Sequence, residues 1–295
     1  MRVAVASNDP NPRLRDAVVV VGGTAGLALA PILVHQTVGA EDWGRTRVVA
    51  WLVDMFLILA VVVALGHAIR GGWFGWLVSQ ENRMSLTRLQ IVLWTTLTVA
   101  AVVVAGVTNL IGSASTGLPE RAATAFDIVI PDQLWLLLGI NVGSAAGTAI
   151  LLGSKRREDP TPEALVRNGF TSETRAMVGG VEVPIAAART VATGTQVADG
   201  ILTKNVAPEQ ARFTDLFSGD ELPNSPYLDI GKVQMFLFTA VAVLTYGLLV
   251  AAAFSAKAPE PFAFPAFNES LITLIAVSHV GYLANLAPNR TPTEN

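Results

Sequence analysis

Six long apolar stretches constrain this sequence more than any other feature. A helix that crosses a lipid bilayer needs about 20 mostly apolar residues, because each residue rises about 1.5 Å across a hydrocarbon core of about 30 Å. Only 15% of the residues are charged, against about 25% in a typical soluble protein. The sequence therefore predicts an all-α integral membrane protein with about six transmembrane helices, at residues 17–38, 48–68, 89–111, 133–153, 233–255 and 268–287.

The distribution of basic residues predicts the orientation of the chain. Segments on the cytoplasmic side of a membrane carry more Lys and Arg, mainly close to helix ends. With the N-terminus in the cytoplasm, the cytoplasmic segments hold 16 basic residues and the outer segments 4. Lys155, Arg156 and Arg157, directly after the fourth window, give a strong local signal. We expect both termini in the cytoplasm and, because Arg outnumbers Lys 16 to 4 as in GC-rich bacterial genomes, a bacterial inner membrane.

The first window has a second interpretation as a signal peptide. It has a basic lead and an apolar core, with "VGA" at 38–40 before Glu41. The lead is long for a signal peptide, so we expect this segment to be retained. The other five helices keep their orientation in either case.

The spacing of the windows divides the chain into five parts. The parts are an N-terminal hairpin (1–70), an interfacial segment (71–88), a hairpin (89–153), a cytoplasmic subdomain (154–231), and a hairpin with a C-terminal tail (232–295). In the interfacial segment, Trp73 and Trp76 are expected at the depth of the lipid headgroups; the alternative is an ordinary loop.

Turn and capping signals predict the content of the cytoplasmic subdomain. Thr161 and Pro162 are typical of a helix start, and a second helix is expected from Pro208 to Gly219. A β-hairpin is expected in the Gly- and Thr-rich stretch between them. The subdomain is too small for a large core of its own, so we expect it to lean on the membrane helices or on a partner protein.

One phrase occurs twice in the sequence. "SLTRLQIVLWTT" begins at Ser85 and "DIGKVQMFLFTA" at Asp229, an offset of 144 residues. The helices that follow also match, at an offset of 134, with "LLGINVGSAAG" aligned to "LITLIAVSHVG". The repeated unit is a helical hairpin, residues 85–153 and 229–287, inserted twice in the same sense. Parallel repeats of this kind are related by a pseudo-two-fold axis along the membrane normal.

The repeated phrase carries a polar residue one turn into each helix. Ser85 and Asp229 are suited to N-caps, and the base that follows can reach lipid phosphate. Gln90 and Gln234 would be costly in hydrocarbon without partners. We expect them to donate hydrogen bonds to a neighbouring helix or to each other; the alternative places both in the interface, bonded to water or headgroups.

Other polar residues fall inside the windows. Asp54 is interpreted as paired with His35 or Arg47, or as part of an ion or proton pathway. His279 is interpreted as a satisfied hydrogen-bonding residue or a proton relay. Together with these two, three further residues would form the polar interior of a transport protein: Asn141, Ser144 and Ser278.

Small residues repeat at four-residue spacing in the fourth window, at Gly139, Gly143 and Gly147. Such spacing lets helix backbones approach closely. We expect helix packing there, with a pore-lining role in an oligomer as the alternative.

No motif for catalysis or metal binding was found. The chain has no Cys and three His, and it lacks P-loop, dinucleotide, zincin and nucleophile-elbow patterns. Asp215, Asp220 and Glu221 do not match a calcium loop and are interpreted as a solvated helix end. We expect no enzyme activity, metal or cofactor, and the net charge of −3 gives no indication of nucleic-acid binding.

The segments "ARFTDLFSGDE", "DIGKVQMFLFTAVAVLTYG" and "SHVGYLANLAP" resemble a recurrent group of uncharacterised bacterial multi-pass membrane proteins with duplicated helical hairpins. These have a base-x-Gln helix followed by a "GIS-x-x-GYL"-like helix; here Ala276 and Val277 replace the Gly and Ile. The resemblance covers about the C-terminal third and implies class and topology only.

Two functions remain open from the sequence. The first is an oligomeric, channel-like or transport-type protein of unknown substrate. The second is a non-conducting membrane anchor or scaffold whose loop 154–231 docks a cytoplasmic protein. The lipid bilayer and other copies of the chain are the expected partners in the first case.

Overall fold

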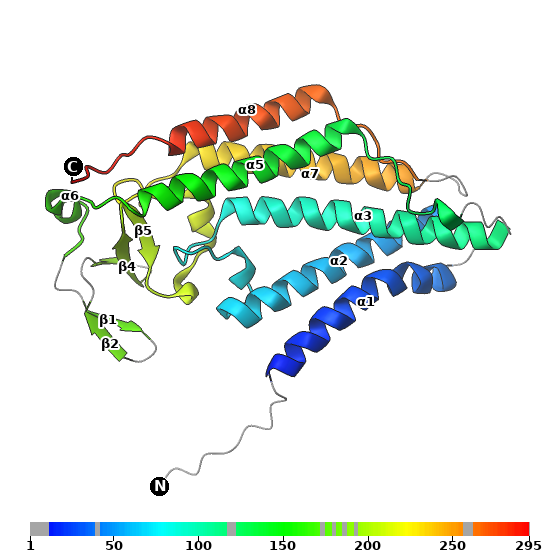
Figure 1. Ribbon diagram of the computed structural model, residues 1–295, viewed down its shortest axis with the longest axis horizontal. Coiled ribbons are helices and arrows are strands. Elements are labelled where there is room, and N and C mark those ends of the chain that lie inside the picture. Colours follow the sequence, from blue (N-terminus) through cyan, green and yellow to red (C-terminus); the bar gives the residue numbers. More distant parts are fainter. Residues whose placement is uncertain are drawn as a thin grey trace, which may run out of the picture.

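The computed structural model describes residues 12–38, 42–116, 122–171, 175–178, 181–184, 188–191, 194–255 and 262–294. Six long helices lie side by side in a bundle, and a small mixed segment covers one end of it (Figure 1). All six helices are long and apolar enough to cross a membrane, as the sequence predicts. They are α1 (Pro12–Val38), α2 (Trp43–Arg70), α3 (Leu86–Thr116), α5 (Asp132–Lys155), α7 (Ile230–Phe254) and α8 (Glu269–Leu286).

The helix starts follow the capping residues. Asp229 accepts a hydrogen bond from the Lys232 backbone at 3.2 Å and so caps α7, as expected. The Ser85 hydroxyl lies 3.5 Å from the Arg88 backbone nitrogen at the start of α3. Local sequence therefore sets where the two repeated phrases become helical.

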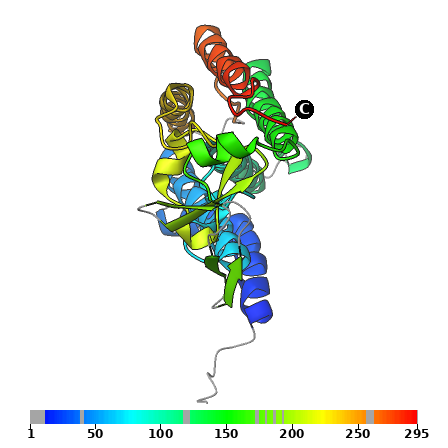
Figure 2. The same cartoon turned by 90° about the vertical axis from the view of Figure 1, so that its left-hand side faces the viewer.

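Successive helices run in opposite directions, so their ends gather at two levels. We call the end where α2, α5 and α8 finish the cap end and the opposite end the far end. α1 packs on α2, α2 on α3, α3 on α5 and on α7, and α5 and α7 on α8. Seen end-on, the helices form an elongated bundle with α1 at one extreme and α8 at the other (Figure 2). The two helices that begin with the repeated phrase, α3 and α7, thus contact each other, as do their successors α5 and α8.

The segment between α5 and α7, which we call the cap, contains strands. The β-hairpin expected in this stretch is confirmed. The all-α class is wrong for this part, although the chain as a whole is mostly helical. Two antiparallel sheets are present, ordered β1-β2 and β3-β4-β5. The strands are β1 (Arg175–Val178), β2 (Val181–Pro184), β3 (Ala188–Val191), β4 (Gly194–Asp199) and β5 (Leu202–Asn205).

The helices of the cap are shorter than expected. α6 (Pro162–Arg167) begins after Thr161, whose side chain caps it. The helix expected from Pro208 to Gly219 is instead two separate 3₁₀ turns, Pro208–Gln210 and Phe213–Phe217. A hydrogen bond from the Arg212 backbone to the Asp215 carboxylate (2.8 Å) closes the second turn locally, in place of a continuous helix.

Two apolar clusters hold the molecule together. The larger fills the bundle and includes Trp94, Tyr246 and Phe254, all at most 2% exposed. The smaller joins the helix ends to the cap, where Leu216 packs with Leu86, Met235 and other apolar residues. The cap therefore leans on the bundle, as its small size requires.

Candidate functional site

A buried ion pair joins the end of α5 to the cap and to the C-terminal tail. The Lys155 ammonium donates to Glu221 Oε1 at 2.8 Å, and the two side chains are 1% and 3% exposed. It also donates to the Pro288 carbonyl at 2.9 Å and to Asn289 Oδ1 at 3.0 Å. Glu221 Oε2 accepts from the Thr291 backbone and hydroxyl at 3.0 and 3.1 Å. Both charges are thus compensated, which a buried ion pair requires.

A second set of ion pairs fastens α7 and the loop before α3 to the same part of the cap. Arg83 donates to the Gly219 carbonyl at 2.7 Å and lies 3.7 Å from the Asp215 carboxylate. Lys232 donates to Asp220 at 2.7 Å. Three separate parts of the chain therefore meet at one acidic segment.

The prediction of a solvated helix end at this acidic segment is wrong. Glu221 is 2% exposed. Lys232 does not reach toward lipid phosphate but turns back to Asp220 and is 5% exposed. Nothing local in the sequence indicates this burial, because the partners come from helices and a tail that are distant along the chain.

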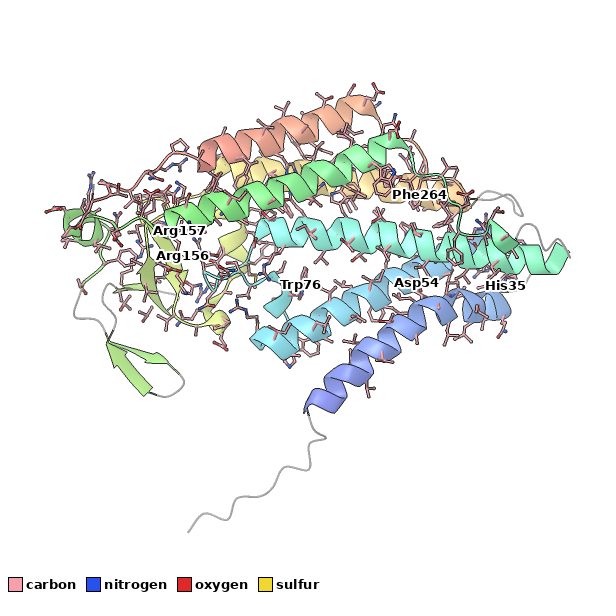
Figure 3. The ribbon with its side chains drawn as sticks, viewed as in Figure 1. His35, Asp54, Trp76, Arg156, Arg157 and Phe264 are labelled. Carbon is pink, nitrogen blue, oxygen red and sulfur yellow. The ribbon has the colours of Figure 1, made fainter. Side chains whose placement is uncertain are left out.

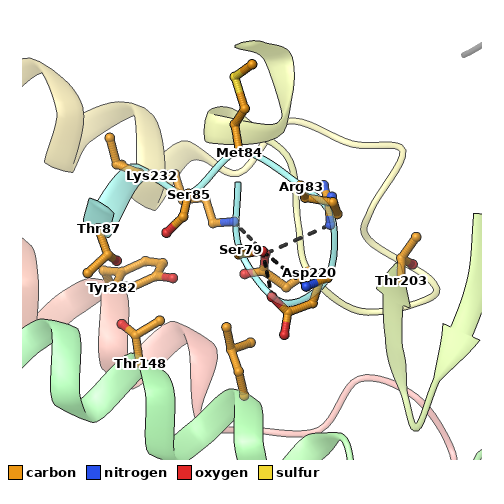
Figure 4. Close-up of a pocket in the computed structure, with 13 residues that line it drawn as sticks. Ser79, Arg83, Met84, Ser85, Thr87, Thr148, Thr203, Asp220, Lys232 and Tyr282 are labelled. Atoms are coloured by element: carbon orange, nitrogen blue, oxygen red, sulfur yellow. Dashed lines mark hydrogen bonds and ion pairs between the residues drawn. The ribbon is translucent and has the colours of Figure 1, made fainter. Parts of the chain in front are cut away.

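A small polar cavity lies among these ion pairs (Figure 4). Its volume is about 40 Å³, which is room for about three water molecules. Arg83, Asp220 and Lys232 form its charged wall, while Thr148 of α5 and Tyr282 of α8 face it from the bundle. The cavity therefore has charged walls and room for water at the point where the bundle meets the cap.

Buried polar residues also lie on α5 and α8, and we call this set the polar seam. α5 and α8 pack on each other, and their buried stripes contain Asn141, Ser144, Thr148, Ser278, His279 and Tyr282. Within the described part of the chain, Asn141 Oδ1, Ser278 Oγ and both ring nitrogens of His279 have no hydrogen-bond partner. Four of the predicted polar residues, Asn141, Ser144, Ser278 and His279, thus lie buried on these two helices. His279 has no hydrogen-bond partner among the described residues, so its interpretation as a satisfied residue is wrong.

The seam ends inside the bundle. Asn141 lies two turns of α5, about 10 Å, beyond Thr148. Further toward the far end, the same interface is closed by Leu137 and Ile275, at 0% and 1% exposure. Phe264 and Phe267 fold back into the apolar cluster behind them. The buried polar residues of α5 and α8 therefore lie between the polar cavity at the cap end and apolar residues at the far end.

Gln90 makes the hydrogen bond that the sequence predicts for it. Its Nε2 donates to Thr239 Oγ1 at 2.7 Å, and both residues are 2% exposed. This bond joins α3 to α7. Gln234 is exposed, and no described residue forms a hydrogen bond with it. The two equivalent glutamines therefore have different surroundings.

We expect this hydrogen bond to couple α3 to α7 by about 0.6 kcal/mol, the average of such bonds between membrane helices. A double-mutant cycle with Gln90→Leu and Thr239→Val, followed by unfolding in SDS, measures the coupling. Additive effects of the two substitutions would show that the pair contributes nothing.

Asp54 lies on α2, in the far-end half of the bundle (Figure 3). It is 0% exposed, and neither carboxylate oxygen has a hydrogen-bond partner within the described residues. The expected pairing with His35 or Arg47 is wrong. His35 stacks on Trp43 with ring centroids 4.5 Å apart, and Arg47 donates to Thr108 at 3.3 Å.

The three glycines at four-residue spacing in α5 have different environments. A side chain added to Gly147 would lie 3.1 Å from Leu283 of α8, so this glycine faces a packed helix. Additions to Gly139 and Gly143 would meet nothing within 4 Å of the described chain. Close packing at these two positions stays a prediction that requires a second copy of the protein.

The sheet is tied to the same junction. Arg156 bonds Asp199 at 3.2 Å and pairs with Glu81. Arg189 donates to Ser225 at 2.5 Å and lies over the Phe170 ring at 4.7 Å. Burial lowers the pKa of Arg189, and the nearby positive charge of Arg83 adds to this effect.

Residues that could bind a metal ion do not gather in this site. Across the ranges given above, no three His, Asp or Glu side chains come together as a metal site would require. The chemistry available is hydrogen bonding and ion pairing by the cavity and the seam.

No protein-family model matches the chain, and no curated protein or solved structure is significantly similar to it.

Proposed function

We propose that the protein is a transport-type protein of a bacterial inner membrane, with the cap and both termini in the cytoplasm. In this proposal a proton or small cation enters the cavity from the cytoplasm and moves along the α5–α8 seam to His279. Six apolar helices support the membrane location. The basic residues at the cap end support the orientation.

The observation that carries the proposal is the unpartnered state of His279. Its side chain is 2% exposed, and no described residue bonds either ring nitrogen. A buried polar group normally has a partner, because leaving it unpaired costs about 1–3 kcal/mol. Ionisable residues inside membrane helices usually mark ion or proton pathways. Ser278 and Asn141 add unpaired oxygen atoms that could replace part of an ion's hydration shell.

Transport would require α5 and α8 to separate at the far end, where Leu137 and Ile275 close the seam. The predicted duplication supports such a movement. Parallel repeats in transporters move as units around a site near their interface, and α5 and α8 are the equivalent helices of the two predicted repeats. Gly139 and Gly143 would support assembly with another copy.

Proton and potassium flux into proteoliposomes tests the proposal. We expect wild-type protein to conduct above empty liposomes, and His279→Ala to reduce that flux about tenfold or more. Thr273→Ala is the matched control, because Thr273 lies on the exposed face of the same helix and should leave flux unchanged. Fluxes are compared at equal amounts of protein in the liposomes, and only for variants that have the same melting temperature as the wild type.

Equal flux through empty and wild-type liposomes would contradict transport. The remaining proposal would then be a membrane anchor whose cap binds a cytoplasmic protein. The exposed aromatic residues Phe213 and Tyr227, at 58% and 71%, favour this second function.

A further inference from the structure

A groove lies between the cap-end halves of α7 and α8 on the side of the bundle. Its volume is about 480 Å³, within the usual size range of small-molecule sites. It sits where α7 begins and α8 ends, so it spans the boundary between the apolar helices and the polar cap. It is separate from the small polar cavity, although Tyr282 borders both.

Apolar and polar residues both line the groove. Its apolar part includes Ile230 and Val277, which are 66% and 62% exposed. Ser278 also lines the groove; it is 5% exposed, and its hydroxyl has no partner among the described residues. Gln234, likewise without such a partner, lies one turn from the start of α7. Unpaired polar groups on an apolar surface are typical of a site that receives an amphipathic ligand.

The mouth of the groove has one charge of each sign. Asp229 begins α7, and Arg290 follows α8 in the C-terminal tail. The Arg290 guanidinium donates to Asn285 Oδ1 at 2.6 Å and to its carbonyl at 3.2 Å, which holds it at the edge of the groove. An anionic headgroup would place its phosphate near the Asp229 carboxylate without a compensating cation. A headgroup with a phosphate and an ammonium would match both charges.

We propose that this groove binds a zwitterionic aminophospholipid, with its phosphate on Arg290, its primary ammonium on Asp229 and part of an acyl chain along Ile230 and Val277. The ammonium offers three N–H donors, which a carboxylate accepts well. This binding goes beyond the proposed transport and does not depend on it.

The equivalent groove of the other hairpin supports the assignment. A groove of about 270 Å³ lies between α3 and α5. Arg156 borders it, 134 residues before Arg290, which is the offset of the second helices of the repeat. There the arginine pairs with Glu81 and Asp199 of this chain. In the α7–α8 groove no described carboxylate forms an ion pair with the arginine. Within the described chain, its guanidinium is bonded only to the uncharged Asn285, so its charge can pair with a ligand.

Lipid retention by the full-length protein in detergent, measured by native mass spectrometry, tests the inference. Phosphatidylethanolamine, phosphatidylcholine and phosphatidylglycerol of equal chain length are added at equal concentration. We expect phosphatidylethanolamine to bind about tenfold more tightly than phosphatidylcholine, whose trimethylated nitrogen has no N–H to donate to Asp229. A preference for phosphatidylglycerol, or equal retention of all three lipids, would overturn the assignment.

Three substitutions locate the bound lipid. Asp229→Asn should remove the preference for ethanolamine while keeping the helix cap, because Asn caps as well as Asp. Arg290→Gln should weaken all three lipids. Gly281→Leu should abolish retention, because a side chain at Gly281 would enter the groove and meets no other atom within 4 Å. Gly22→Leu, equally open but on α1, is the control. Wild-type retention by Gly281→Leu would show that the lipid binds elsewhere.

Discussion

Replacing Lys155 by Met should lower the free energy of unfolding by about 3–5 kcal/mol, the cost of leaving one partner of a buried ion pair alone. The substitution removes the ammonium that compensates Glu221, whose side chain is 3% exposed. It also removes the hydrogen bonds to Pro288 and Asn289 that hold the C-terminal tail. SDS titration of the purified protein, followed by circular dichroism, measures the change.

Two further variants distinguish the effect of an uncompensated buried charge on stability from the effect of losing one side chain. Lys155→Met combined with Glu221→Met should be less destabilised than Lys155→Met alone, because no charge is then left buried. Lys204→Met is the control: its pair with Asp199 is half-exposed, so its loss should cost at most about 1 kcal/mol. A Lys155→Met variant as stable as Lys204→Met would show that the pair does not hold the cap to the bundle.

Replacing Gly66 by Ala should destabilise the protein by about 2–3 kcal/mol, although Ala is the better helix former. A methyl group at Gly66 would lie 2.7 Å from the Trp76 Cα and 2.6 Å from its Cβ. The contact is with backbone, so a side-chain rotation cannot relieve it. The segment from Trp76 to Arg83 would have to move away from α2, and with it one wall of the polar cavity.

Gly22→Ala provides the matched control for this prediction. Gly22 is also inside a helix, but an added methyl group meets nothing within 4 Å. It should therefore be neutral or raise stability by up to about 1 kcal/mol, through helix propensity alone. The same SDS titration applies. Equal effects of the two substitutions would mean that the close approach of α2 and Trp76 is not required for folding.

The geometry of the polar cavity depends on the ion pairs and hydrogen bonds that join the cap to the helix bundle. Lys155, Arg83 and Lys232 come from different segments around the bundle and all contact residues between Ser218 and Glu221. This fastening gives the cavity a fixed shape. It also places the α7–α8 groove at the edge of the cap, where a lipid headgroup would have access.

The duplication of the helical hairpin remains a prediction from the sequence. The helices that it relates lie next to each other in the bundle. The helices that share a repeated phrase contact each other, α3 with α7 and α5 with α8. The environments of equivalent residues nevertheless differ. Gln90 bonds Thr239 in the core, while Gln234 lies exposed in the groove. The two glutamines that the sequence aligns therefore have different structural environments.

Features that depend on residues close together in the chain can be predicted from the sequence alone. Six apolar stretches of sufficient length became six helices, and Asp229 and Thr161 cap helices where expected. These follow from residue-level hydropathy and from hydrogen bonds between residues three apart. Gln90 was also anticipated, because a Gln in an apolar helix needs a partner.

Which polar groups are paired depends on the folded chain. Glu221 is buried against Lys155, 66 residues away, and Asp54 and His279 have no partners among the described residues. The region that ends at Gly219 was expected to be one helix but forms short turns, and two small sheets precede it in the chain. These outcomes depend on contacts between distant segments. Burial and ion pairing are properties of the assembled bundle and cap, and no local pattern of residues determines them.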